Sequence, residues 1–343
     1  MARVNVGRLY EELLELHGRA IAEAFRRAVE TLQGTADLQR VISALERRDL
    51  AEALEALHID SVPFNEMLDA LSDAFAAGGQ NAIAFLPAKT PEGIALAIRF
   101  DTRNVRAEDY LRRHGAELVS RVVEDVRTAA RQKLITGMER GDAPRRVALD
   151  VIGRINRASG KRDGGVLGLT AQQERAAQAA EDELRSGDAA ALRSYLARAK
   201  RDRRFDRSVQ KAIREGGALS AETVTKAATQ YRNRLLQLRG ETIARTEALT
   251  ALNAAQFEAL LQAVETGKLR ASQIRRVWRS AGDRRVRDTH AGLHGDTAGL
   301  TEAFQSPSGA TLRFPGDPLA PAAERINCRC WTMPRVDWAA NLR

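Results

Sequence analysis

Two pairs of potential metal ligands lie near the C-terminal end of the sequence. His290 and His294 are four positions apart, and Cys328 and Cys330 are two positions apart. Two imidazoles and two thiolates suit a tetrahedral Zn²⁺ ion, and an ion bound by both pairs would close the long loop between them. The sequence therefore offers a candidate structural zinc site made of these four side chains.

The spacing leaves other interpretations open. Zinc-binding cysteines usually have roughly two to four residues between them, and Gly292 weakens a helix that would align the histidines. In the simplest alternative the histidines hydrogen-bond locally and the cysteines pack as small apolar residues. One cysteine with His290 and Asp283 would instead form a thiol–imidazole–carboxylate set for nucleophilic catalysis or hydrolysis. The HExxH metalloprotease pattern is excluded, because Ala291 follows His290.

A basic, glycine-rich loop spans residues 157–169. Arg157, Lys161 and Arg162 lie there among four glycines, a composition that suits contact with phosphate groups. The loop is not that of an NTPase, because neither Ser nor Thr follows the lysine. It is either a solvated connector or a surface for a polyanion.

The densest basic segment lies at residues 200–207. Asp202 and Asp206 are interleaved with its cations, which is typical of a salt-bridged helix face or turn. The alternative is direct contact with DNA phosphates. The candidate contacts in this segment are Lys200, Arg201, Arg203 and Arg204.

The net charge of the 343-residue chain, +9, is concentrated in its middle third. Residues 153–245 alone carry a net charge of +9, whereas residues 1–152 carry −3 and residues 246–343 carry +3. This distribution favours a polyanionic partner for the middle region. No apolar run of about 18 residues exists, so no membrane span is expected. Near the N-terminus, acidic residues stand where a signal peptide would have its apolar core. The two cysteines are too close together to connect distant segments by a disulfide. Together these observations predict synthesis in a reducing cytoplasm.

The elements that must position these residues are mostly helices. Apolar residues recur at helical spacing through most of the first 265 residues. We expect Gly78 and Gly79 to end a helix, residues 94–100 to form a strand, and a break near Gly240 to separate two helices. Short strands are expected at residues 275–279 and 312–314.

The predicted fold is therefore mostly α. Elongated helical N-terminal and middle regions precede a small α+β C-terminal module. The expected divisions are an N-terminal helical region at residues 1–90, a basic helical middle region at residues 91–240, and the module at residues 241–343.

Four ordered motifs in the last third resemble a known family. Ala244-Arg245-Thr246-Glu247 comes first, followed by Trp278 with the Asp283–Arg287 segment and His290. Gly295, a proline-rich loop and Asn327-Cys328-Arg329-Cys330 complete the set. In this order they resemble the phage Mu F-like head-morphogenesis proteins, which are minor capsid components of tailed phages. The resemblance covers about residues 240–335, and its motif residues are Arg245, Glu247, Trp278, Asp283, Arg287, His290 and Asn327.

The resemblance implies a structural protein rather than an enzyme. It would act in capsid assembly at the portal vertex and in DNA packaging or ejection. The implied partners are the portal protein, the major capsid protein or scaffold, and packaged double-stranded DNA bound without sequence preference. The implied location is the capsid interior near the portal, and assembly would take place in the host cytoplasm. No cofactor is expected other than a structural zinc ion. Two alternatives remain: a metal-dependent nuclease or hydrolase that uses the His/Cys cluster, and a plain DNA-binding protein.

Overall fold

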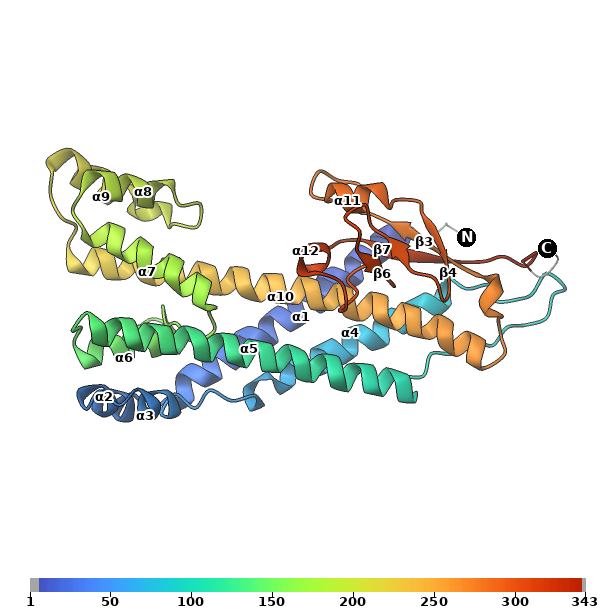
Figure 1. The fold of residues 1–343 in the computed structure, drawn as a ribbon, viewed down its shortest axis with the longest axis horizontal. Helices are drawn as coiled ribbons and strands as arrows, with labels where there is room; N and C mark the ends of the chain where they lie inside the picture. Colours follow the sequence, from blue (N-terminus) through green and yellow to red (C-terminus); the bar gives the residue numbers. More distant parts are fainter. Residues whose placement is uncertain (1–5, 341–343) are drawn as a thin grey trace. The chain divides into compact units, whose positions relative to one another are not determined.

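The computed structural model describes residues 6–340, which are mostly helical, with a few short antiparallel strands near the C-terminal end (Figure 1). This confirms the expected combination of a mostly α chain and a small α+β module. The helices are α1 (Val6–Thr35), α2 (Leu38–Glu46), α3 (Leu50–Glu55), α4 (Asn65–Ala84), α5 (Val105–Glu139), α6 (Pro144–Ile152), α7 (Ala171–Arg185), α8 (Ala189–Ala197), α9 (Asp206–Glu215), α10 (Ala221–Glu265), α11 (Asp288–Gly292) and α12 (Ala322–Arg325). The strands are β1 (Arg154–Ile155), β2 (Arg162–Asp163), β3 (Ile274–Arg279), β4 (Thr297–Gly299), β5 (Phe304–Gln305), β6 (Thr311–Leu312) and β7 (Trp331–Val336).

The chain divides into two compact units, and each is built from separate stretches of sequence. Unit 1 contains residues 6–24, Glu66–Glu117 and 241–340, and unit 2 contains Phe25–Asn65 and Leu118–Gly240. Within residues 6–340 the chain passes from one unit to the other at four points, including the bond between residues 240 and 241. Helices α1, α5 and α10 each contribute to both units.

In unit 2, helices α7, α8 and α9 pack around the first half of α10 (Figure 1). The buried side chains of their core are those of leucine, alanine and valine, apart from Tyr195 and Tyr231. Helix α7 begins with a capping box, in which Thr170 and Gln173 satisfy each other's backbone N–H groups. The basic glycine-rich loop becomes a short antiparallel hairpin, β1–β2, with Ile155 opposite Arg162.

A buried ionic network lies within unit 2. Arg232 of α10 donates to Glu174 and Glu181 of α7 at 3.0–3.3 Å, and all three residues are at most 3% exposed. Lys133 of α5 lies 3.6 Å from Asp150 of α6 and 3.7 Å from Glu174. The network joins four helices, and loss of one charge would leave its partners buried without compensation.

In unit 1, helix α4 does not end at its two glycines. Gly78 packs on the backbone of Leu252 in α10 and Gly79 on the ring of Phe100; an added Cβ would lie 2.6 Å and 2.1 Å from these neighbours. The glycines therefore serve close packing inside a continuous helix, and the predicted helix end was wrong. The predicted strand at residues 94–100 is also absent, and one isolated bridge joins Lys89 to Ala95.

Helix α10 is a single helix of 45 residues, so the predicted break near Gly240 was wrong. An added Cβ at Gly240 would lie 3.1 Å from the ring of Phe25. This glycine, too, marks a close approach rather than a helix end.

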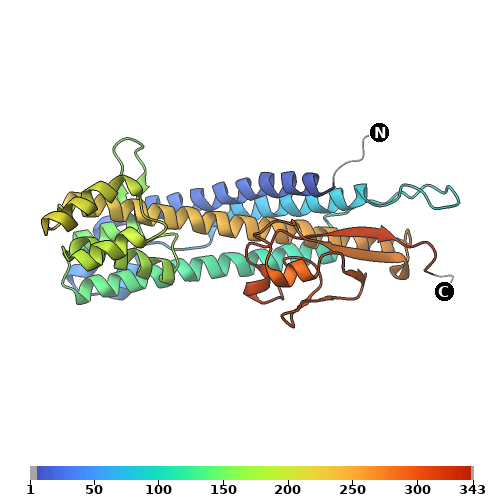
Figure 2. The ribbon, with the colours of Figure 1, turned by 90° about the horizontal axis from the view of Figure 1, so that it is seen from above.

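The C-terminal module is a three-stranded antiparallel sheet in the order β4–β3–β7, with the β5–β6 hairpin, α11 and α12 beside it (Figure 2). The first expected strand is part of β3, whereas the second, at residues 312–314, overlaps β6 of the hairpin only at Leu312. Its core contains Trp278, Leu312, Cys328 and Cys330 together with Leu249 of α10. The module is thus built on the second half of the long helix.

We expect Gly78→Ala to lower the free energy of unfolding by about 1–3 kcal/mol, because the new methyl group would overlap the Leu252 backbone. Gly18→Ala in α1 is the matched control. It has open space around its Cα, and loss of glycine flexibility should stabilise the helix by about 0.5–1 kcal/mol. Urea denaturation followed by circular dichroism measures both. Equal effects would contradict the packing role.

Asp150 makes the network sensitive to acid. Burial alone raises the pKa of Asp150, but the charges of Lys133 and Arg154 outweigh it and hold the pKa below the ordinary 3.8. A depressed folded-state pKa contributes stability that is present above the unfolded-state pKa and is lost as the pH falls through the folded-state value. Asp150→Asn should therefore destabilise the protein by about 1–3 kcal/mol at about pH 7 and by much less at about pH 3. The exposed Glu139→Gln is the control, and a pH-independent difference for Asp150→Asn would refute the linkage.

Candidate metal centre

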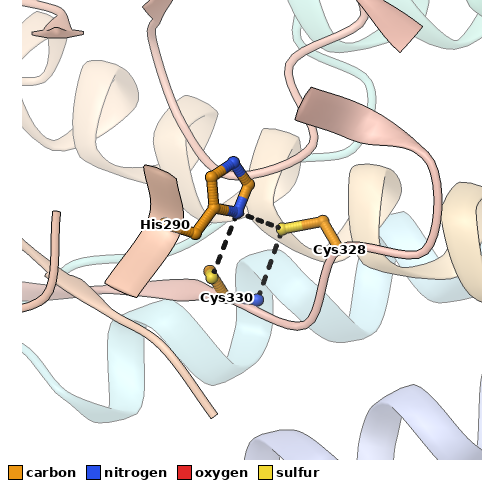
Figure 3. Close-up of side chains that lie close together, drawn as sticks. All are labelled: His290, Cys328 and Cys330. Carbon is orange, nitrogen blue, oxygen red and sulfur yellow. Dashed lines mark hydrogen bonds between the residues drawn. The ribbon is translucent and has the colours of Figure 1, made fainter. Parts of the chain in front are cut away.

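Three of the four predicted metal ligands converge in the module. The Nδ1 atom of His290 lies 3.4 Å from Cys328 Sγ and 3.5 Å from Cys330 Sγ (Figure 3). The three ligand atoms lie within 4.8 Å of one another. His290, Cys328 and Cys330 are each at most 2% exposed. We call these three residues the His-Cys cluster.

Different elements supply the members of the His-Cys cluster. His290 belongs to the short helix α11, and both cysteines lie between α12 and β7. The guanidinium of Arg287, the residue before α11, donates to the carbonyls of Glu324 and Ile326 at 2.6 Å each. It thereby holds α11 against the segment that leads to Cys328.

Glu324 orients the imidazole of His290. Its Oε2 atom lies 2.6 Å from His290 Nε2, and its side chain is 5% exposed. The carboxylate accepts a hydrogen bond from the Nε2–H group, so the Nδ1 atom carries a lone pair that faces the two sulfurs. Glu324 is not among the predicted site residues, because nothing in the local sequence Ala-Ala-Glu-Arg distinguishes it from a surface glutamate.

The two thiols titrate differently. Hydrogen bonding with Cys330 and then with His290 lowers the pKa of Cys328 despite its burial. The same contact with Cys328, together with burial, raises the pKa of Cys330. The pair thus loses its first proton easily and its second with difficulty, because two adjacent anionic sulfurs repel each other.

The fourth predicted ligand, His294, lies outside the cluster. Its Nδ1 atom accepts from the backbone N–H of Ser280 at 3.2 Å and lies 3.0 Å from the Ser280 hydroxyl. Asp283 likewise does not reach His290, because it pairs with Arg329 at 2.6 Å. Hydrogen bonding to Arg329 lowers the pKa of Asp283. In the thiol–imidazole–carboxylate arrangement the carboxylate is therefore that of Glu324.

The remaining motif residues lie in different surroundings. Trp278 is fully buried and meets His290 edge-on, with ring centroids 5.3 Å apart. Glu247 pairs with the buried His114 of α5 at 2.7 Å, whereas Arg245 is exposed. Asn327 has a positive φ of 56°, and its N–H donates to the Thr246 hydroxyl of α10 at 3.1 Å.

Residues 203–333 match the family described as Phage Mu protein F like protein. This part of the chain is similar to the phage Mu F-like family. The match contains α9, α10, the His-Cys cluster and Glu324, and it supports a phage head-morphogenesis protein. We call residues 203–333 the Mu F-like segment.

One curated relative is the uncharacterized protein YqbB of Bacillus subtilis (strain 168). It is 38% identical over 102 residues, which cover 29% of this chain and 31% of the relative. The chain thus matches about a third of the length of that protein. No solved structure matches the chain.

Further buried polar groups of α10 hold the end of the Mu F-like segment. Thr250 donates to the carbonyl of Gly316 at 2.9 Å, and Asn253 donates to the carbonyl of Cys330 at 3.1 Å. Gln256 accepts from the Thr332 hydroxyl at 2.7 Å. These side chains satisfy parts of a loop that has little secondary structure of its own.

The predicted DNA contacts divide into paired and unpaired cations. Lys161 pairs with Glu30 at 3.0 Å, Arg162 donates to the Gly153 carbonyl, and Arg201 and Arg204 pair with the interleaved Asp206 and Asp202. Among the predicted DNA contacts, which all lie within the described residues, three exposed cations have no ion-pair partner: Arg157, Lys200 and Arg203.

The two predicted DNA-contact segments approach one cavity of unit 2. Among the residues that line this groove of about 500 Å³ are Ile155 and Asp163 of the hairpin, Arg204 of the basic segment, and Lys226 of α10. The structure therefore places near one groove two segments that are about 40 residues apart in the sequence. DNA binding itself stays a prediction.

Arg276 is the buried cation that holds the sheet of the module. It is 1% exposed and donates to the carbonyls of Gly299, Glu302 and Arg313. Burial lowers its pKa to about 10, so it remains charged at neutral pH. We expect Arg276→Lys to cost about 2–4 kcal/mol of unfolding free energy, because one ammonium group cannot serve three separated carbonyls.

The neighbouring Arg275 provides a matched control for this prediction. It lies on the same strand, is half-buried, and donates only to the carbonyl of Ile274. Arg275→Lys should change stability by less than about 0.5 kcal/mol in the same denaturation experiment. Similar losses in both variants would show that the strand tolerates lysine poorly for a reason other than the three carbonyls.

Proposed function

We propose that the protein is a minor head protein of a tailed phage or prophage, acting in capsid assembly at the portal vertex and in DNA packaging or ejection. The observation that carries this proposal is the Mu F-like segment, which includes the whole C-terminal module up to residue 333. The partners in this role are the portal protein, the major capsid protein or scaffold, and packaged double-stranded DNA. None of the helices in residues 6–340 has the length and apolar composition that a membrane span requires.

A structural role fits the surroundings of the reactive side chains. A hydrolase is the second candidate, because the contacts match those of a catalytic set. Cys328 would be the nucleophile, His290 the base and Glu324 the carboxylate that orients the base. A nucleophile must meet its substrate, however, and Cys328 and His290 are 2% and 1% exposed. Cavities of about 430 and 500 Å³ are lined by other residues. The burial of the set therefore supports assembly rather than turnover.

The portal role is tested by co-expressing the tagged protein with the portal protein of the same phage or prophage. A complex of defined stoichiometry on size exclusion is expected, and head particles that lack the protein should be non-infectious or poorly filled with DNA. Normal, infectious heads in its absence would contradict the proposal. Hydrolysis of nucleic acid or ester substrates that is lost in His290→Ala would favour the enzyme.

The DNA contact is tested through the salt dependence of binding. Replacing the three unpaired cations of unit 2 by alanine should lower the slope of log K against log salt concentration by about two to three, since each phosphate contact contributes roughly 0.9. The control removes the same charge from exposed, unpaired arginines of unit 1. A loss that is equal in both triple variants would reflect net charge rather than a local contact. The test variant is Arg157→Ala/Lys200→Ala/Arg203→Ala, and the control is Arg99→Ala/Arg103→Ala/Arg284→Ala.

A further inference from the structure

We propose that His290, Cys328 and Cys330 bind one Zn²⁺ ion, which fastens the last loop of the module to α11. This inference goes beyond the role in head assembly and does not depend on it. The three protein ligands are the Nδ1 atom of the histidine and the two sulfurs. A water molecule would occupy the fourth position of the tetrahedron, since His294 is engaged with Ser280.

The two nitrogen–sulfur distances in the cluster match those around a shared zinc ion. Zinc lies roughly 2.3 Å from sulfur and 2.0–2.1 Å from nitrogen, so tetrahedral geometry separates the two ligand atoms by roughly 3.6 Å. The observed separations between His290 Nδ1 and the two sulfurs are 3.4 and 3.5 Å. Both sulfurs are therefore placed at nearly the distance that a single ion between them and the imidazole requires.

Both sulfurs approach the same nitrogen atom. With the proton on Nε2 held by Glu324, Nδ1 of His290 has one lone pair, yet both sulfurs lie within 3.5 Å of it. One thiol can donate to that lone pair, so the other sulfur lies equally close to the nitrogen without a hydrogen bond to it. A cation accepts donation from all three atoms at once. A carboxylate behind the ligating histidine is also the usual outer partner of a zinc-bound imidazole.

Two buried donors lie near the sulfurs. The Tyr10 hydroxyl has no hydrogen-bond partner within the described residues, and the Trp278 indole N–H faces the Cys330 sulfur. Tyr10 stacks on Trp331, the residue after Cys330, with centroids 5.6 Å apart, while Trp278 meets His290. Thiolates accept hydrogen bonds far better than neutral thiols, so deprotonated, metal-bound sulfurs would suit these surroundings.

The ion would close a long loop. His290 lies 38 and 40 residues before the two cysteines, and β4, β5, β6 and α12 occupy the interval. The unfolded chain lacks a preformed site, so the free energy of zinc binding adds to the free energy of folding. The ion would thus stabilise the module.

Metal content and cobalt spectroscopy of the full-length protein test the proposal. About one zinc per chain is expected after purification without chelator. Replacement by Co²⁺ should give the intense visible bands of four-coordinate cobalt and thiolate-to-cobalt charge transfer in the near ultraviolet. Cys328→Ser and Cys330→Ser should each weaken the charge-transfer band, and removal of metal by chelator should lower the melting temperature.

Two histidine variants and one carboxylate variant make the assignment specific. His290→Ala should abolish stoichiometric binding, whereas His294→Ala should retain it. Glu324→Gln should weaken zinc affinity by about 10–100-fold, the usual effect of losing an outer partner. Absence of metal from the wild-type protein together with failure to bind added Zn²⁺ or Co²⁺ would overturn the proposal, and so would equal losses in His290→Ala and His294→Ala.

Discussion

The C-terminal module depends on a stripe of buried polar side chains along α10. Thr246, Thr250, Asn253 and Gln256 recur at helical spacing, and each is at most 5% exposed. They bond to the backbone of residues 316–330 and to the hydroxyl of Thr332. A loop that crosses a helix without regular structure must find partners for its backbone groups, because buried groups left unpaired cost about 1–3 kcal/mol each. The stripe supplies those partners and so fixes where both cysteines lie.

The family motif therefore corresponds to the contacts of one loop. Arg287 holds the carbonyls before Cys328, Asp283 pairs with Arg329, and Thr246 accepts the N–H of Asn327. Motif residues that are 80 positions apart in the sequence meet within one structural feature. Their order along the chain is explained by a sheet strand, a short helix and a return loop that all pack on α10.

The sequence predicted the types of elements better than their contacts. Helical spacing identified most helices, and the ligand-like pairs identified His290, Cys328 and Cys330. Glu324 was invisible because its role arises only when α12 packs beside α11. Gly78 and Gly240 were misread for a similar reason: glycine at a helix end and glycine at a close crossing look alike in a sequence, and only the neighbour that excludes a Cβ distinguishes them.

The charge pattern of the sequence likewise does not show which cations are paired inside the fold. The excess of cations in the middle third predicts a polyanionic partner, yet several of those cations serve the fold. Arg232 is buried between two glutamates, and Arg201 and Arg204 are paired with interleaved aspartates. An arginine committed to a buried carboxylate contributes little to an external phosphate, because breaking the internal pair would leave a buried charge uncompensated. Net charge therefore overstates the extent of a DNA-binding surface, and the exposed cations without internal partners are the residues that favour DNA contact.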